Sequence, residues 1–301
     1  SRGLGDVYKR QVQHNALPTG RVNVTLSGNG IPEYDIVEGV AWDALEADAG
    51  TLELAARADA VCWGSLAQRS ETSRRTIAAI LEATRPECLK VFDINIRQHW
   101  YSREIVTASL GHADVLKLNE GELPLVASLL GIGKSSAEAI AELVRAFSLR
   151  YVVYTAGADH SEIHGAEGLL SRIPTPEIEV ADTVGAGDSF TAAFITSLLQ
   201  GEPVAASHRK AVETAAKVCT MHGAIPRPQN GTKKAPGIPV LFHFRLQYTL
   251  SALPGPASDG SNPHPNCGIR RPRPAAIISG WPRPSWSAAR NRRPRAARRA
   301  A

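Results

Sequence analysis

The chain has 301 residues, of which 43% are hydrophobic and 21% are charged, proportions that are ordinary for a globular protein. No stretch approaches the roughly 18 consecutive apolar residues of a membrane helix, so the composition excludes a membrane-spanning class. The four cysteines, Cys62, Cys88, Cys219 and Cys267, form no Cys-x-x-Cys pair, which argues against a disulfide framework or a zinc ribbon and predicts a cytoplasmic location.

The net charge of +5 is unevenly distributed along the chain. Residues 230–301 hold 13 of the 34 basic residues and only one of the 29 acidic residues, so this segment carries +12 and residues 1–229 carry −7. The same segment holds 11 of the 20 prolines. Because such a composition buries too little apolar surface to offset the entropy of ordering, we expect a disordered Pro- and Arg-rich tail. Residues 1–11 are expected to be a non-native leader, which leaves residues 12–229 as the domain.

The first predicted element is a β-hairpin over about residues 20–40. Val22 to Leu26 (VNVTL) and the later PEYDIVEG have the composition of strands. Between them, Asn29-Gly30 is a dipeptide that accepts the positive φ angles of a tight turn.

After the hairpin, short apolar stretches alternate with helical ones. Continuous apolar strands are typical of a parallel sheet covered on both faces, so the pattern predicts an α/β fold with crossover helices. The predicted strands are 60–64, 89–94, 113–118 and 150–155, followed by the pair SEIHG and LLSRIP, and the predicted helices are 71–85, 121–131 and 136–148. Ser135 and Glu138 form a capping-box pattern at the start of the last of these helices.

A glycine-containing loop, Gly185, Ala186 and Gly187, precedes a further predicted helix that stops at Gly201. Free backbone N–H groups and the positive end of the helix dipole meet at such a helix start, where they bind anions such as phosphate. Asp188 follows at once, as a carboxylate suited to accept a proton from a hydroxyl that attacks a bound phosphorus. The alternative is that Asp188 only caps the helix.

The whole string DTVGAGDSFTAAF closely resembles the C-terminal signature of the ribokinase-like (PfkB) carbohydrate kinases. Upstream, FDINIRQHW (92–100) is similar to the family's strand with an Asp, an Asn and an Arg, NEGE (119–122) matches its Asn-x-x-Glu motif, and VVYTAGADH resembles its nucleotide-side strand. The resemblance spans roughly residues 12–229. PTGRVNVTL, YDIVEGVAWDAL and WGSLAQRSETSR look like the fructokinase branch.

This resemblance implies a three-layer α/β/α fold with a mostly parallel sheet and the remnant of a β lid. It implies an ATP-dependent kinase that phosphorylates a sugar, most simply fructose, and uses Mg²⁺ and in some relatives K⁺. The implied roles are as follows: Asp188 as catalytic base; Gly185, Ala186 and Gly187 as anion hole; Asn119 and Glu122 around magnesium and phosphate, partly through water; Thr155 and Gly157 along the nucleotide; Asn95 and Arg97 near substrate or phosphate; Asp182 and Thr183 at a monovalent-cation site.

Simpler explanations stand beside several of these roles. Arg97 suits a surface ion pair, and Asn119 and Glu122 suit helix capping, because both fall where a helix is predicted to begin.

The family's N-terminal strands and its Gly-rich sugar-binding motif find no counterpart here, so we expect an N-terminally truncated kinase domain. Two further hypotheses are therefore kept: a catalytically impaired nucleotide-binding fragment, and, ranked last, a nucleic-acid binder acting through the basic tail. The expected partners are a sugar and ATP, without a membrane, and a homodimer is considered.

Overall fold

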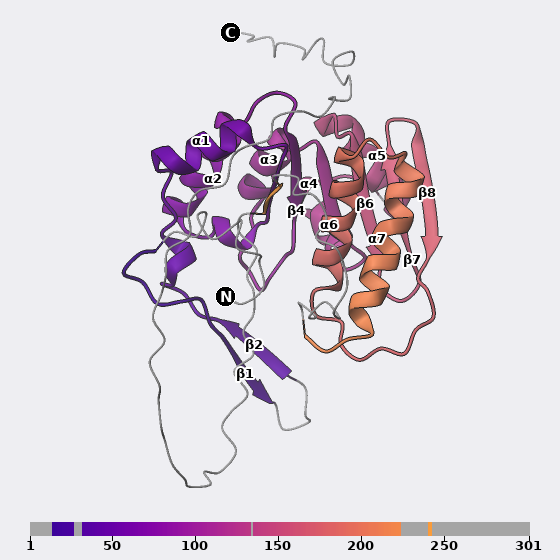
Figure 1. Cartoon of the computed structure of the whole chain (residues 1–301), viewed down its shortest axis with the longest axis horizontal. Helices are drawn as coiled ribbons and strands as arrows, with labels where there is room; N and C mark the ends of the chain where they lie inside the picture. Colours follow the sequence, from indigo (N-terminus) through magenta and orange to yellow (C-terminus); the bar gives the residue numbers. More distant parts are fainter. Residues whose placement is uncertain (1–13, 27–31, 134, 224–239, 243–301) are drawn as a thin grey trace, which may run out of the picture. The chain divides into compact units, whose positions relative to one another are not determined.

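The computed structural model describes residues 14–26, 32–133, 135–223 and 240–242. Within these residues, a seven-stranded sheet has the order β8-β7-β6-β5-β4-β3-β9 (Figure 1). The strands from β6 to β9 in this order are parallel to one another, and β7 and β8 run antiparallel to their neighbours. The strands are β3 (Ala60–Trp63), β4 (Leu89–Asp93), β5 (Val115–Asn119), β6 (Tyr151–Ala156), β7 (His160–Gly165), β8 (Gly168–Pro174) and β9 (Val240–Phe242).

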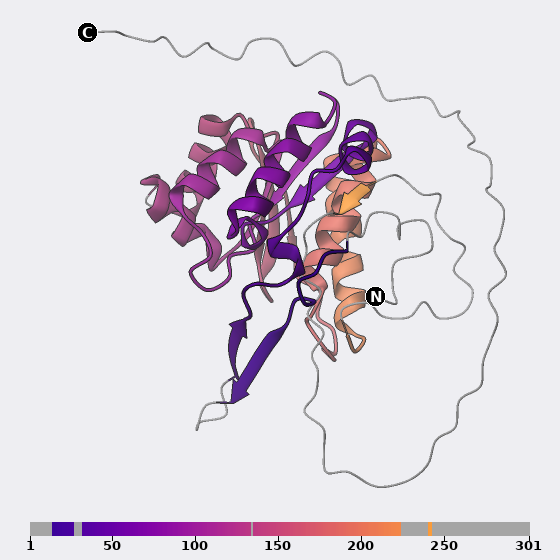
Figure 2. The ribbon, with the colours of Figure 1, turned by 90° about the vertical axis from the view of Figure 1, so that its left-hand side faces the viewer.

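Helices cover both faces of this sheet, which confirms the expected α/β class and its three layers. The side chains of Val61 and Trp63 pack in one apolar cluster with α1 to α5, whereas Ala60 and Cys62 pack in a second cluster with α6 and α7. Figure 2 shows α6 and α7 on the side of the sheet opposite to α3, α4 and α5. The helices are α1 (Ala49–Arg57), α2 (Glu71–Ala83), α3 (Arg103–His112), α4 (Glu122–Leu130), α5 (Ser136–Phe147), α6 (Ala186–Leu199) and α7 (Val204–Cys219).

The predicted hairpin is present as a separate antiparallel pair, β1 (Val22–Leu26) and β2 (Pro32–Ile36). The register pairs Val22 with Ile36. The Asn29-Gly30 turn lies outside the described residues.

Most of the predicted elements are confirmed to within two residues at each end. The capping box at α5 is also confirmed, because Ser135 Oγ accepts from Glu138 N while the Glu138 carboxylate accepts from Ser135 N. Helices α1, α3 and α7 and strand β9 were not among the predictions.

The expectations for the two ends of the chain stay predictions. Residues 1–11 lie outside the described part. Within residues 230–301 only Val240–Phe242 are described, and they pair with β3 instead of lying free. Among the described residues, no helix is both long and apolar enough to cross a membrane.

Candidate active site

Several of the predicted site residues lie at or just beyond the carboxyl ends of the parallel strands. Asn95 and Arg97 follow the end of β4, Asn119 is the last residue of β5, and Thr155 lies near the end of β6. Because these strands are adjacent and parallel, their carboxyl ends lie side by side, which is where ligands bind in open α/β sheets.

The glycine loop stands at the N-terminus of α6, as predicted. Gly185 is the N-cap residue with φ of 85°, a left-handed conformation that glycine adopts without steric cost. The Ala186 amide donates to the Thr183 carbonyl at 3.2 Å, and the Ser189 amide donates to the Gly185 carbonyl at 2.9 Å. Asp188 therefore lies in the first turn of α6, where it is half-buried and next to the helix's positive pole.

Asp182 holds the loop before α6 in shape. Its carboxylate accepts from Val184 N at 2.9 Å and from Gly223 N at 3.0 Å. These backbone hydrogen bonds lower the pKa of Asp182 below its usual value. Its own amide and that of Ala181 donate to the Cys219 carbonyl at the end of α7, so this loop is tied to both helices, while Thr183 is exposed.

Asn119 and Glu122 cap the start of α4 reciprocally. Asn119 Oδ1 accepts from the amides of Gly121 and Glu122, each at 2.9 Å, and Glu122 Oε2 accepts from Asn119 N at 2.9 Å. The other oxygen of Glu122 accepts from Ile96 N at 2.8 Å. Burial raises the pKa of Glu122, and the Lys117 ammonium acts against that rise. Helix capping thus accounts for the hydrogen bonds of both side chains at the start of α4. Their roles toward magnesium and phosphate stay predictions.

The loop after β4 carries the predicted substrate residues in an unusual backbone conformation. Asn95 and Gln98 have φ values of 44° and 48°, in the left-handed region that non-glycine residues occupy rarely. Arg97 is half-buried, and its Nη1 donates to the Ile96 carbonyl at 2.9 Å. The hydrogen bond from Ile96 to Glu122 joins this loop to α4.

Thr155 and Gly157 lie at the end of β6 and just beyond it. The Thr155 carbonyl accepts from Glu120 N at 3.0 Å, which places the segment after β5 against β6. The Gly157 carbonyl accepts from Thr175 Oγ1 at 2.9 Å. The first contact brings Thr155 beside the Asn119–Glu122 cap, and the second joins Gly157 to the segment that follows β8.

A buried ionic cluster beneath α6 is not predicted from the sequence. Lys117 Nζ lies 3.2 Å from Asp93 Oδ1, and both side chains are less than one-tenth exposed. Thr191 Oγ1, on the second turn of α6, lies within hydrogen-bond distance of Asp93 Oδ2 at 3.2 Å and of the Gly187 carbonyl at 2.9 Å. The cluster therefore connects the glycine loop to the ends of β4 and β5. The sequence signal that could have indicated this cluster is the presence of Asp93 and Lys117 within two otherwise apolar strands.

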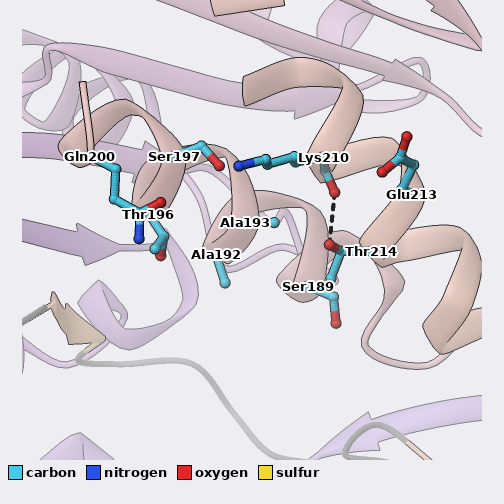
Figure 3. Close-up of a pocket in the computed structure, with 9 residues that line it drawn as sticks. All are labelled: Ser189, Ala192, Ala193, Thr196, Ser197, Gln200, Lys210, Glu213 and Thr214. Atoms are coloured by element: carbon cyan, nitrogen blue, oxygen red, sulfur yellow. Dashed lines mark hydrogen bonds between the residues drawn. The ribbon is translucent and has the colours of Figure 1, made fainter. Parts of the chain in front are cut away.

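A shallow groove of about 470 Å³ runs along the outer side of α6 and α7 (Figure 3). It is lined mainly by small and polar side chains: Ser189, Ala192, Ala193, Thr196, Ser197, Gln200, Lys210, Glu213 and Thr214. Ser189 is its only link to the predicted site among the described residues, because it follows Asp188 in sequence.

Several known proteins are similar to this chain. A 2-dehydro-3-deoxygalactonokinase of Haloferax volcanii is 33% identical over 160 residues, which are 51% of this chain and 49% of that protein. A Fructokinase-1 of Oryza sativa subsp. japonica is 28% identical over 215 residues, 69% of this chain and 65% of that protein. The chain thus spans about half to two-thirds of the length of these curated relatives.

Solved structures share the fold. A fructokinase with bound ATP from Xylella fastidiosa has a TM-score of 0.60 at 19% identity, covering 71% of each chain. An uncharacterized sugar kinase from Pyrococcus horikoshii has a TM-score of 0.59 at 22% identity, covering 71% of this chain and 68% of that one. Both identities are low, so these structures support the ribokinase-like architecture alone.

The family assignment comes from the sequence as a whole. The family model described as "pfkB family carbohydrate kinase" matches residues 18–230, which include the hairpin, strands β3 to β8 and the glycine loop before α6. This chain therefore belongs to the pfkB family of carbohydrate kinases.

Proposed function

We propose that this chain transfers the γ-phosphoryl group of ATP to a hydroxyl group of a sugar, with fructose as the acceptor. The observation that carries the proposal is the place of Asp188, in the first turn of α6 directly after the left-handed Gly185. Family membership and the kinase names of the relatives support it.

In this reaction Asp188 takes the proton of the acceptor hydroxyl as the hydroxyl oxygen attacks the γ-phosphorus. The amides of residues 185–187 stabilise the negative charge of the transferring group, helped by the helix dipole. The Ala186 N–H now donates to the Thr183 carbonyl, so it exchanges that acceptor for a phosphate oxygen when ATP binds.

Magnesium fits the residues near the Asn119–Glu122 cap if it is bound mainly through water. Among the described residues, no group of three His, Cys, Asp or Glu side chains is arranged to hold a metal ion. Each oxygen of Glu122 accepts one backbone N–H, which leaves a second acceptor position on each for a magnesium-bound water. Magnesium, when bound, neutralises charge on the β- and γ-phosphates. A potassium site at Asp182 and Thr183 stays a prediction.

Fructose as acceptor is supported by the Fructokinase-1 relatives from rice and from Zea mays. Other relatives are named for different substrates, such as 2-dehydro-3-deoxygalactonate and fructosamine. A panel of these three acceptors is therefore the proper assay.

The decisive comparison is between the full chain and its Asp188→Asn variant, with Mg²⁺-ATP and the acceptor panel. We expect turnover to fall by about 10²–10⁴-fold, because a general base contributes about that much, while ATP affinity measured by calorimetry stays the same. Glu213→Gln, which changes an exposed carboxylate on α7, is the matched control and should be unaffected. Unchanged turnover in Asp188→Asn would refute the assigned base.

Two other outcomes would redirect the proposal. Binding of ATP without phosphorylation of any acceptor would favour a nucleotide-binding fragment. Salt-dependent nucleic-acid binding that disappears with residues 230–301 would favour the tail hypothesis. The homodimer and the cytoplasmic location stay predictions.

A further inference from the structure

Arg69 lies at a junction of segments that are far apart in the sequence. It follows β3 by six residues, and its guanidinium forms a two-pronged ion pair with Asp43, with Nε 2.8 Å from Oδ1 and Nη2 2.7 Å from Oδ2. The two side chains are only 2% and 11% exposed. Paired geometry of this kind fixes the plane of the guanidinium as well as its charge.

The same guanidinium also holds the base of the β1–β2 hairpin. Nη2 donates to the Val37 carbonyl at 2.7 Å, and Nη1 lies 3.4 Å from the carbonyl of Ile36, the last residue of β2. Just before β1, on the other side of the hairpin base, Gly20 lies so close to Trp42 that a Cβ at residue 20 would overlap the indole ring. Arg69 lies over that ring, with its Cζ 3.9 Å from the ring centroid. Both bases of the hairpin therefore meet the Arg69–Trp42 pair.

A third partner belongs to the loop of residues 95–101. The Trp100 ring centroid lies 5.2 Å from the Arg69 Cζ, and Trp100 Nε1 donates to Gln98 Oε1 at 3.1 Å. This is the loop in which Asn95 and Gln98 have positive φ. Non-glycine residues keep such a conformation only where their surroundings enforce it. Trp100 contributes to this constraint through its hydrogen bond to Gln98.

We propose that Arg69 is a positioning residue that couples the β1–β2 hairpin to the loop of residues 95–101. A planar group is required because one side chain must bond a carboxylate and a carbonyl in its plane and contact rings through its face. The consequence for catalysis rests on the proposed function: displacement of the hairpin would move the loop that holds Asn95 and Arg97, and so alter acceptor binding.

Amide hydrogen exchange of the full chain, followed by mass spectrometry, tests the coupling without any need for activity. In Arg69→Lys we expect exchange to become about tenfold to hundredfold faster in residues 32–43 and in residues 95–101, because bonds to charged groups limit local opening. Strand β5 should keep its rate. Arg75→Lys, which alters a largely exposed arginine on α2, is the control and should change neither segment.

Trp100→Leu supplies the crossed test, because it leaves the Arg69–Asp43 pair intact. If the coupling exists, this change in the loop also speeds exchange in residues 32–43. Faster exchange confined to the mutated segment in either variant, or a uniform increase over the whole chain, would overturn the proposal.

A kinetic test separates this inference from the proposed function. Where phosphoryl transfer occurs, Arg69→Lys should raise the KM of the acceptor and leave the KM of ATP unchanged. An inactive chain that still shows coupled exchange would contradict the proposed function and leave the coupling standing.

Discussion

Lys117 stands directly opposite Asp93 on neighbouring parallel strands, and its ammonium lies 3.2 Å from the carboxylate, with both side chains buried. The Thr191 hydroxyl lies within hydrogen-bond distance of Asp93 Oδ2 and of the Gly187 carbonyl, and its one hydrogen can be donated to either. The start of α6 is thus supported from below by an ion pair that spans β4 and β5.

Lys117→Met should destabilise the protein strongly, because it removes the Lys117 ammonium from beside the buried Asp93 carboxylate. We expect a loss of about 3–5 kcal/mol in the free energy of unfolding, measured by urea denaturation. Lys90→Met, at a half-buried lysine on β4, should cost less than about 1 kcal/mol. Combining Lys117→Met with Asp93→Asn should recover part of the loss. Equal losses in the two lysine variants would show that the ion pair has no special role.

Thr191→Val should disturb the glycine loop with little change in shape. It removes the hydroxyl that lies within reach of both Asp93 Oδ2 and the Gly187 carbonyl and donates its one hydrogen to either. This loss should cost about 1–3 kcal/mol of stability, and Thr191→Ser should restore most of it. Thr214→Val is the comparison, because Thr214 also bonds a carbonyl four residues back but is exposed. Its cost should stay within about 0.5 kcal/mol. A similar small cost for Thr191→Val would argue against the link.

Stability should fall as the pH is lowered from 6.5 toward 4, because of His208. This side chain is fully buried, with Nε2 2.8 Å from Ser161 Oγ and Nδ1 2.8 Å from Ser171 Oγ. Burial lowers its pKa from 6.5 to about 4. Between these values the unfolded chain binds a proton that the folded chain does not, so protons favour unfolding.

The loss attributable to His208 should reach at most about 3 kcal/mol. Urea denaturation at several pH values measures it. The His208→Gln variant should show a flatter profile over the same interval, whereas His14→Gln, at an exposed position, should keep the slope of the parent. A parallel profile for His208→Gln would mean that other groups cause the dependence.

Two nearby glycines allow the cost of a positive φ alone to be compared with the cost of a positive φ combined with a steric clash. Gly131 and Gly133 both have positive φ, of 72° and 61°. A Cβ added at Gly131 would meet no described atom within 4 Å, but one at Gly133 would lie 2.5 Å from Ala139 N. We expect Gly131→Ala to cost about 1–2 kcal/mol and Gly133→Ala to cost at least about 1 kcal/mol more. Thermal unfolding of both variants checks the order, and equal costs would contradict it.

The parallel core was predictable because its strands carry their own signal. The apolar stretches that contain Val61, Val91 and Leu116 are buried on both faces, as their composition predicts. The glycine loop and the start of α6 were predictable for the same local reason, since Gly185 and Asp188 mark a helix N-terminus.

The partners of buried polar groups could not be predicted, because they depend on strand order and register. Nothing near Lys117 in the sequence indicates that Asp93 is its neighbour, and that pairing follows only from β4 and β5 being adjacent. His208, on α7, likewise contacts Ser161 on β7 and Ser171 on β8. The Asn119–Glu122 cap is local, and it was foreseen as an alternative.

The two edge strands of the sheet differ in how far along the chain their pairing partners lie. At one edge, β6, β7 and β8 follow one another closely and pair in sequence, so a nascent chain can form them early and with little loss of entropy. At the other edge, Val240 pairs with Ala60, which closes a very long loop. The β3–β9 contact should therefore assemble last during folding and open first under mild denaturant.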